Sequence, residues 1–148
     1  MNPIDVKIKL VREGAKLPTY ATEGSAACDL SACIKTPITL YPGERIRIPT
    51  GIAISIPGGT VAIVCARSGI ALKRGLTLSN GIGVIDSDYR GEISVVLRNV
   101  SDTPQTVEPD ERIAQLMFMP HFTAVFEECY NLDETDRGEG GFGSTGRN

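Results

Sequence analysis

The stretch "GIAISIPGGTVAIVCA", residues 51–66, decides the fold class. Two short apolar runs rich in isoleucine and valine flank Pro57, Gly58 and Gly59. Proline and glycine in succession are typical of a turn, and β-branched residues favour extended strands. The stretch therefore predicts two strands joined as a hairpin.

The alternation of apolar and polar residues continues outward from this stretch. In "DVKIKLV" (5–11), Val6, Ile8 and Leu10 fall on one predicted face. The same period of two appears in "ERIRIP" (44–49), "EISVVLRN" (92–99), "RIAQLMF" (112–118) and "FTAVFEE" (122–128). Many short strands separated by glycine and proline predict an all-β sandwich or barrel. At 148 residues we expect a single domain over 1–148.

One short helix is predicted in "RSGIALKRG", residues 67–75. Ser68 is the expected N-cap, Lys73 and Arg74 occupy the last turn, and Gly75 is the expected stop.

Composition excludes several classes of protein. The net charge of −3 argues against a general nucleic-acid binder. No apolar run reaches the roughly 18 residues that span a bilayer, and "MNPIDVKIKLV" lacks the apolar core of a signal peptide, so we expect no membrane partner and a cytoplasmic location. The four cysteines are irregularly spaced without a C-x-x-C pair, which predicts free thiols rather than zinc ligands.

Three stretches contain candidates for chemistry, and each has an ordinary structural alternative. "ARSG" (66–69) joins an arginine, which suits phosphate or carboxylate, to a helix start, which attracts anions. The alternative is a helix cap beside a surface arginine, and this stretch alone does not decide between them.

"NGIGVIDSDYRGEI" (80–93) is the second stretch. Gly81 and Gly83 suggest a hairpin whose backbone is open to a ligand. Asp86 would be ionised at neutral pH and could accept a proton from water. Aspartates also form turns by bonding their own backbone, and on residue types alone that is the commoner role.

The third stretch is the C-terminal "RGEGGFGSTGRN" (137–148), which we predict to be a flexible arm on a β body of residues 1–136. It resembles a phosphate-binding loop but lacks the essential lysine. Phe142 could stack on a base, while Arg137, Ser144 and Thr145 could bind phosphate oxygens. The alternative is a frayed terminus.

Together and in this order, "SAACDL", "ARSG", "GVIDSDYRGEI", "ERIAQLMF" and "RGEGGFGSTG" resemble the trimeric dUTPase family over essentially the whole chain. The resemblance implies a jelly-roll-like β-barrel, a homotrimer with active sites shared between subunits, and hydrolysis of dUTP to dUMP and pyrophosphate. It also implies a glycine-rich arm that closes over a neighbour's site, and Mg²⁺ held mainly by triphosphate oxygens and water. Two departures from the usual pattern, Cys28 and Ala66, lie beside the chemical residues, and a thiol at Cys28 suggests sensitivity to oxidation.

The resemblance also implies roles for individual residues. Asp86 matches the general base that activates water, and Tyr89 matches the residue packed under the sugar. Asp29 matches the acidic residue that contacts the metal through water. The remaining substrate-binding positions are Asn80, Gly83, Val84 and Ile85 for uracil; Arg67, Ser68, Gly69 and Gln115 for the phosphates; and Phe142 with Arg137, Gly143, Ser144 and Thr145 from the arm.

Two other functions fit parts of this pattern. One is a dCTP deaminase-like relative, for which we expect a different catalytic set and no intact arm. The other is a non-catalytic regulator that binds dUTP, although no residue with a chemical role is missing.

Overall fold

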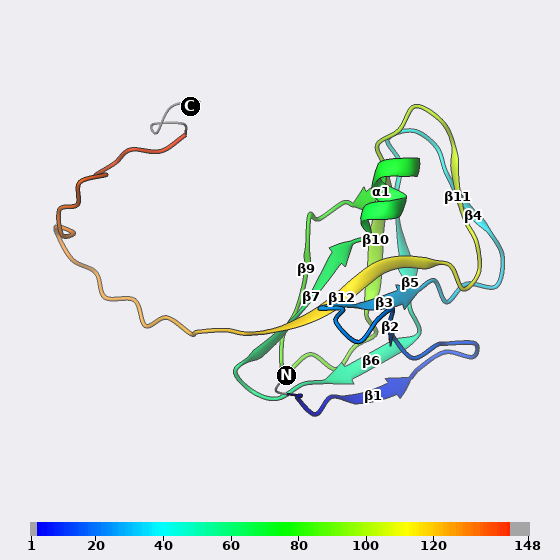
Figure 1. The fold of residues 1–148 in the computed structure, drawn as a ribbon, viewed down its shortest axis with the longest axis horizontal. Helices are drawn as coiled ribbons and strands as arrows, with labels where there is room; N and C mark the ends of the chain where they lie inside the picture. Colours follow the sequence, from blue (N-terminus) through cyan, green and yellow to red (C-terminus); the bar gives the residue numbers. More distant parts are fainter. Residues whose placement is uncertain (1–2, 143–148) are drawn as a thin grey trace.

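A computed structural model describes residues 3–142 of the chain, and within that range it is built from short strands and one helix (Figure 1). This confirms the all-β prediction with one short helix. No helix within the described range is long and apolar enough to cross a membrane. The elements are β1 (Lys7–Leu10), β2 (Thr19–Tyr20), β3 (Cys28–Ser31), β4 (Ile38–Leu40), β5 (Arg45–Pro49), β6 (Ile52–Ser55), β7 (Thr60–Ala66), α1 (Ser68–Arg74), β8 (Leu76–Leu78), β9 (Gly83–Ile85), β10 (Ser94–Asn99), β11 (Gln105–Val107) and β12 (Arg112–Pro120).

The strands of the 51–66 stretch form as predicted, but the hairpin is wrong. β6 pairs with β1, whereas β7 lies between β12 and β9 in the sheet ordered β2-β3-β12-β7-β9. The turn is closed by the Thr60 amide donating to the Pro57 carbonyl at 3.3 Å, and only Gly59 of its two glycines has a positive φ. Two-residue hairpins of type I′ need positive φ at both central positions, and other turns splay the strands. The chain therefore crosses here from one sheet to another.

The core lies between the sheets and follows the predicted alternation. Three residues in or next to β10 are almost fully buried: Ile93, Val95 and Leu97. Arg98, the next residue along the strand, is exposed. β10 pairs with both β5 and β8, so Leu97 lies opposite Ile46 on one side and Leu78 on the other. Each fully buried aliphatic side chain contributes about 1.5–3 kcal/mol, which makes this row a main source of stability.

Helix α1 begins one residue earlier than predicted. The N-cap is Arg67, whose backbone is extended and whose side chain makes no cap hydrogen bond, so the prediction of Ser68 as N-cap is wrong. An arginine side chain has no acceptor for the free amides of a helix start, and the guanidinium of Arg67 donates elsewhere. The predicted end is confirmed: Gly75 is the C-cap with φ 64°, and a Cβ there would lie 2.8 Å from the Cβ of Ser101.

The strand predicted over 122–128 does not form. β12 ends at Pro120, and residues 121–142 contain no strand and are almost entirely exposed. Figure 1 shows this segment leaving the β body as an extended chain. Phe122, Val125 and Phe126 are more than nine-tenths exposed, because no strand of the same chain lies alongside to pair with them. The exposed segment thus begins at His121, well before the arm boundary predicted at Arg137.

Candidate active site

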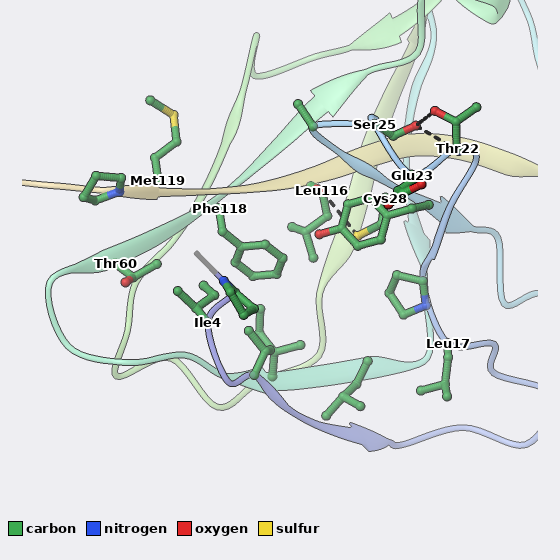
Figure 2. Close-up of a pocket in the computed structure, with 18 residues that line it drawn as sticks. Ile4, Leu17, Thr22, Glu23, Ser25, Cys28, Thr60, Leu116, Phe118 and Met119 are labelled. Atoms are coloured by element: carbon green, nitrogen blue, oxygen red, sulfur yellow. Dashed lines mark hydrogen bonds between the residues drawn. The ribbon is translucent and has the colours of Figure 1, made fainter. Parts of the chain in front are cut away.

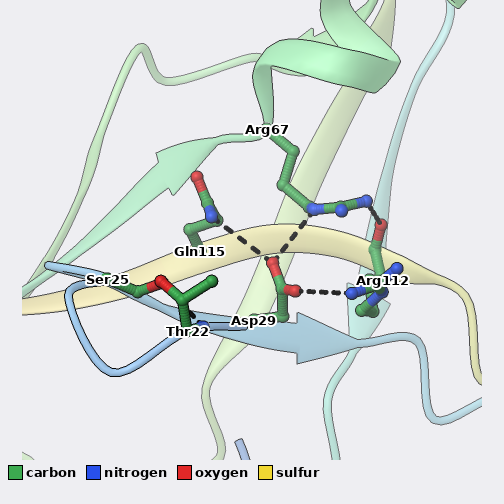
Figure 3. A network of polar contacts seen from close by, with 6 residues as sticks. All are labelled: Thr22, Ser25, Asp29, Arg67, Arg112 and Gln115. Atoms are coloured by element: carbon green, nitrogen blue, oxygen red, sulfur yellow. Dashed lines mark hydrogen bonds and ion pairs between the residues drawn. The ribbon is translucent and has the colours of Figure 1, made fainter. Parts of the chain in front are cut away.

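A buried carboxylate, that of Asp29, lies at the centre of the first cluster of candidate residues (Figure 3). Arg67 donates from Nε to Asp29 Oδ1 at 3.0 Å, and Arg112 donates from Nη1 to Asp29 Oδ2 at 3.1 Å. Gln115 donates from Nε2 to Oδ1 at 3.4 Å. Both carboxylate oxygens are therefore occupied, and burial of the charge is offset by two guanidinium groups.

Strand register explains why these residues meet although they are far apart in sequence. Gln115 on β12 lies opposite Asp29 on β3 and also opposite Cys65 on β7. Residues in one row of a sheet point to the same face. Arg67 follows the end of β7 directly and turns its side chain back toward this row. A register shift in β12 between Arg112 and Ala114 places Arg112 beside Asp29 as well.

The first cluster can bind an anion. Two arginines and one aspartate leave it with one net positive charge. Arg67 Nη1 also donates to the Arg112 carbonyl at 2.8 Å, so Arg67 is held at two points while its Nη2 makes no hydrogen bond within residues 3–142. Ser68 and Gly69 lie exposed beside it at the start of α1. A fixed guanidinium with a free edge suits a phosphate oxygen.

The second cluster is the stretch 80–89, and here too the predicted hairpin is wrong. β8 pairs with β10 and β9 pairs with β7, so the turn between them connects two sheets. Gly81 takes the positive φ (73°) that this turn needs. Gly83 packs against Val64, where a Cβ would come within 3.0 Å of the valine Cβ. Asn80 and Val84 remain exposed, while Ile85 is partly buried.

Asp86 and Tyr89 belong to one turn at the end of β9. The Tyr89 amide donates to the Asp86 carbonyl at 3.1 Å, which fixes the spacing of the two residues. Asp86 is exposed, and no side-chain hydrogen bond engages its carboxylate within the described part of the chain. An exposed carboxylate without a cationic neighbour can act as a base toward water.

The two clusters lie at opposite ends of β7. β9 runs antiparallel to β7 with Ile85 opposite Ala62, so Asp86 lies near the start of β7 whereas Arg67 follows its end. At about 3.3 Å per residue, the backbones of Asp86 and Arg67 are roughly 20 Å apart along the strand. The Arg67 side chain also turns toward β3, on the side of β7 away from β9. One chain therefore does not bring the two clusters together.

Of the C-terminal candidates, Arg137 and Phe142 lie within the described residues, and they join neither cluster. Arg137 donates from Nε to the Gly140 carbonyl at 2.8 Å, and Phe142 is fully exposed with φ 47°. Gly143, Ser144 and Thr145 lie outside the described residues. Among residues 3–142, no three His, Cys, Asp or Glu side chains gather as metal ligands.

A hollow of about 1040 Å³ is separate from both clusters (Figure 2). Its lining is mostly apolar and comes from the N-terminal segment, β1, β2 and the end of β12, and includes Ile4, Ile8, Leu17, Tyr20, Phe118 and Met119. Cys28 also lines it, because alternation along β3 points Cys28 and Asp29 to opposite faces. The Cys28 thiol is 4% exposed and donates to the Leu116 carbonyl, and burial raises its pKa. The structure therefore argues against the predicted oxidation sensitivity at Cys28.

Sequence reasoning missed two residues that support the clusters. Arg112 lies in the same "ERIAQLMF" stretch as Gln115, but nothing local shows that it pairs with a carboxylate 83 positions away. Gly91 lies against the Tyr89 ring, where a Cβ would come within 2.3 Å of the phenolic oxygen. In the sequence, only its position two residues after Tyr89 indicates that Gly91 could contact this ring.

Comparison with known proteins identifies related chains over nearly the full length. A family model described as dUTPase matches residues 13–146. The chain is 53% identical to a deoxyuridine 5′-triphosphate nucleotidohydrolase of Desulfitobacterium hafniense over 149 residues, covering 99% of both chains. It is 48% identical to the protein of the same name from Fusobacterium nucleatum, covering 96% of this chain and 98% of the other. Among solved structures, the dUTPase of Staphylococcus bacteriophage 80alpha with dUPNHPP superimposes with a TM-score of 0.88 at 27% identity, covering 96% of this chain and 98% of that one. These similarities confirm the family and its jelly-roll-like β fold.

Proposed function

The chain belongs to the dUTPase family, and from this premise we propose that it hydrolyses dUTP to dUMP and pyrophosphate. The observation that carries the proposal is the near-full-length similarity to dUTP nucleotidohydrolases. The cluster of Asp29, Arg67 and Gln115 supports it, because three separate motifs of the sequence meet in one anion-binding arrangement.

Asp86 acts as the general base in this mechanism. Its carboxylate takes a proton from a water molecule, whose oxygen attacks the α-phosphorus and displaces pyrophosphate. The exposed position of Asp86, free of arginine partners in the described residues, leaves its lone pairs available for that water.

Phosphate binding falls to the first cluster. Arg67 offers its free edge, Gln115 lies beside it, and the amides of Ser68 and Gly69 at the uncapped start of α1 are additional donors. From the arm, Arg137, Gly143, Ser144 and Thr145 bind the terminal phosphate.

Base and sugar recognition fall to the second cluster and to Phe142. Asn80 and the backbone of Gly83, Val84 and Ile85 read uracil, since the 4-oxo group of uracil and the 4-amino group of cytosine invert the hydrogen-bond pattern. Phe142 stacks on the base. Tyr89 packs under the deoxyribose, where a 2′-hydroxyl would clash.

The residues fit Mg²⁺ held by the substrate rather than by a protein cage. Three nitrogen donors occupy most of the lone pairs of the Asp29 carboxylate, which agrees with a contact to the metal through water. When bound, Mg²⁺ neutralises charge on the triphosphate oxygens. Its preference for oxygen ligands and retained waters agrees with such a site.

The active assembly is a homotrimer in which neighbouring subunits complete each site. Two features support this proposal: the separation of Asp86 from Arg67 within one chain, and the exposed apolar side chains of residues 122–132. We keep the predictions of a cytoplasmic location and of no nucleic-acid or membrane partner as part of the proposal.

Pyrophosphate release tests the proposal. The intact chain with Mg²⁺ is expected to release pyrophosphate from dUTP but not from dCTP, dTTP or UTP, and a chain ending at Asp136 is expected to lose this activity. Ammonia release from dCTP would favour the deaminase-like alternative. Tight dUTP binding without turnover in the intact chain would favour the regulator.

A further inference from the structure

The turn that follows β9 holds the Tyr89 ring in one place. The Tyr89 hydroxyl donates to the Glu92 carbonyl at 3.1 Å, and Arg90 Nη1 donates to the carbonyls of Ser87 and Tyr89 at 2.7 and 2.9 Å. The Tyr89 amide also donates a hydrogen bond to the Asp86 carbonyl, so the residue is held both at its backbone and at the hydroxyl end of its ring.

The ring lies directly on Gly91. A Cβ at Gly91 would come within 2.3 Å of the Tyr89 hydroxyl oxygen and 2.5 Å of the ring carbon that bears it, and its three nearest atoms would all belong to this ring. Gly91 does not have a positive φ, so its backbone would accept an L-residue. What excludes a side chain at this position is the tyrosine ring.

Glu92 is itself held firmly in place, and its backbone carbonyl is the group that accepts from the Tyr89 hydroxyl. Its carboxylate accepts from Arg12 Nε at 2.5 Å and Nη2 at 2.8 Å, and from the Gly51 amide at 2.9 Å. The carbonyl that receives the Tyr89 hydroxyl therefore belongs to a residue anchored to two other parts of the chain.

We propose that Gly91 is a positioning residue for sugar selectivity, because it leaves the space in which the Tyr89 ring lies beneath the substrate's deoxyribose. The inference rests on the proposed function, in which Tyr89 excludes the 2′-hydroxyl. A side chain at Gly91 displaces the ring, which is about two-fifths exposed and can move outward once the hydrogen bond from its hydroxyl to Glu92 breaks. Asp86 keeps its place in the turn, since its contact with Tyr89 is through the backbone.

The test compares Gly91→Ala with Gly24→Ala, a glycine without positive φ where a Cβ meets nothing within 4 Å. The ratio of kcat/KM for dUTP to that for UTP is expected to fall about tenfold or more in Gly91→Ala and to stay unchanged in Gly24→Ala. A change in the fold alone would lower both activities and leave the ratio. An unchanged ratio in Gly91→Ala would overturn the inference.

A second pair of variants tests whether Gly91 acts through the ring. In a Tyr89→Ala background, Gly91→Ala is expected to change neither the substrate ratio nor the Tm, whereas it lowers the Tm of the otherwise intact chain. Equal Tm losses in both backgrounds would overturn the inference, as would misfolding of the double variant beside a folded Tyr89→Ala. The Tm comparison needs no turnover, so it tests the contact between Gly91 and the Tyr89 ring even where the intact chain proves inactive and the proposed function fails.

Discussion

The separation of Asp86 from Arg67 predicts that two inactive variants restore each other. Asp86→Asn removes the proposed base, and Arg67→Ala removes the proposed phosphate ligand. Along β7 the two residues are about 20 Å apart in one chain. A general base must lie within hydrogen-bond reach of the attacking water, next to the phosphates that Arg67 binds. A working site must therefore take these residues from different subunits.

The expected recovery follows from counting. When the two variants are co-expressed in equal amounts and assemble at random, about one quarter of sites draw an intact Asp86 from one subunit and an intact Arg67 from its neighbour. Pyrophosphate release from dUTP should then reach about one quarter of the wild-type rate per site, while each variant alone stays near zero. Two affinity tags allow mixed trimers to be isolated, and because one site in three is intact in each of them, their rate should rise to about one third of the wild-type rate per site.

Two controls make this result specific. Wild-type chains given the same two tags show that tagging leaves turnover intact. A chain carrying both substitutions, co-expressed with Asp86→Asn, offers no intact Asp86 and should stay inactive. Mixed assemblies no more active than the separate variants would refute the reasoning from register and would place both residues in one subunit's site.

Three further predictions concern the charges and thiols of the β body. Asp29→Asn leaves two arginines without their counter-charge. This substitution should lower the free energy of unfolding by about 1–3 kcal/mol, measured by denaturant unfolding, and raise KM for dUTP, measured by kinetics. Asp5→Asn, at an exposed position, should change neither quantity. The hydrogen bond from Arg12 lowers the pKa of Glu92, so Glu92 stabilises the fold fully above its unfolded pKa and loses this as pH falls through its lower folded value. Glu92→Gln should therefore cost about 1 kcal/mol at pH 7 and progressively less toward pH 3, and a constant difference would contradict the assignment. Alkylation followed by mass spectrometry should label Cys28 only after unfolding, and labelling in the native protein would show that this thiol is accessible.

Local patterns in the sequence predicted the buried residues of β10 but not those of every strand, because β1 has the same alternation and is exposed throughout. The alternation of Ile93, Val95 and Leu97 survives in the structure because a strand with one face on the core must alternate, whichever strands it pairs with. The end of α1 at Gly75 was predictable for a similar reason, since a left-handed residue there needs glycine.

Strand partners were not predictable in the same way. The turns at residues 57–60 and 79–82 look like hairpin turns, yet each carries the chain between sheets, because the partners of β6, β7, β8 and β9 come from distant parts of the chain. The strand expected at 122–128 has the right pattern but pairs with no strand edge among residues 3–142. The same is true of the candidate site. Residue types suggested its members, but only the register of β7 with its neighbours shows that they form two groups.

The exposed C-terminal segment is two segments with different physical needs. Ordering a residue costs about 1–2 kcal/mol of backbone entropy, and burying a large apolar side chain returns about 1.5–3 kcal/mol. Residues 122–132 include Phe122, Val125, Phe126, Tyr130 and Leu132, all exposed, so contact with a second subunit can offset the cost of ordering them. Residues 137–142 have Phe142 as their one large apolar side chain, beside the charged Arg137 and Glu139 and the backbone donors. Apolar burial alone cannot order that part, so in the proposed function the charges of a bound nucleotide must supply the rest, as a closing arm requires.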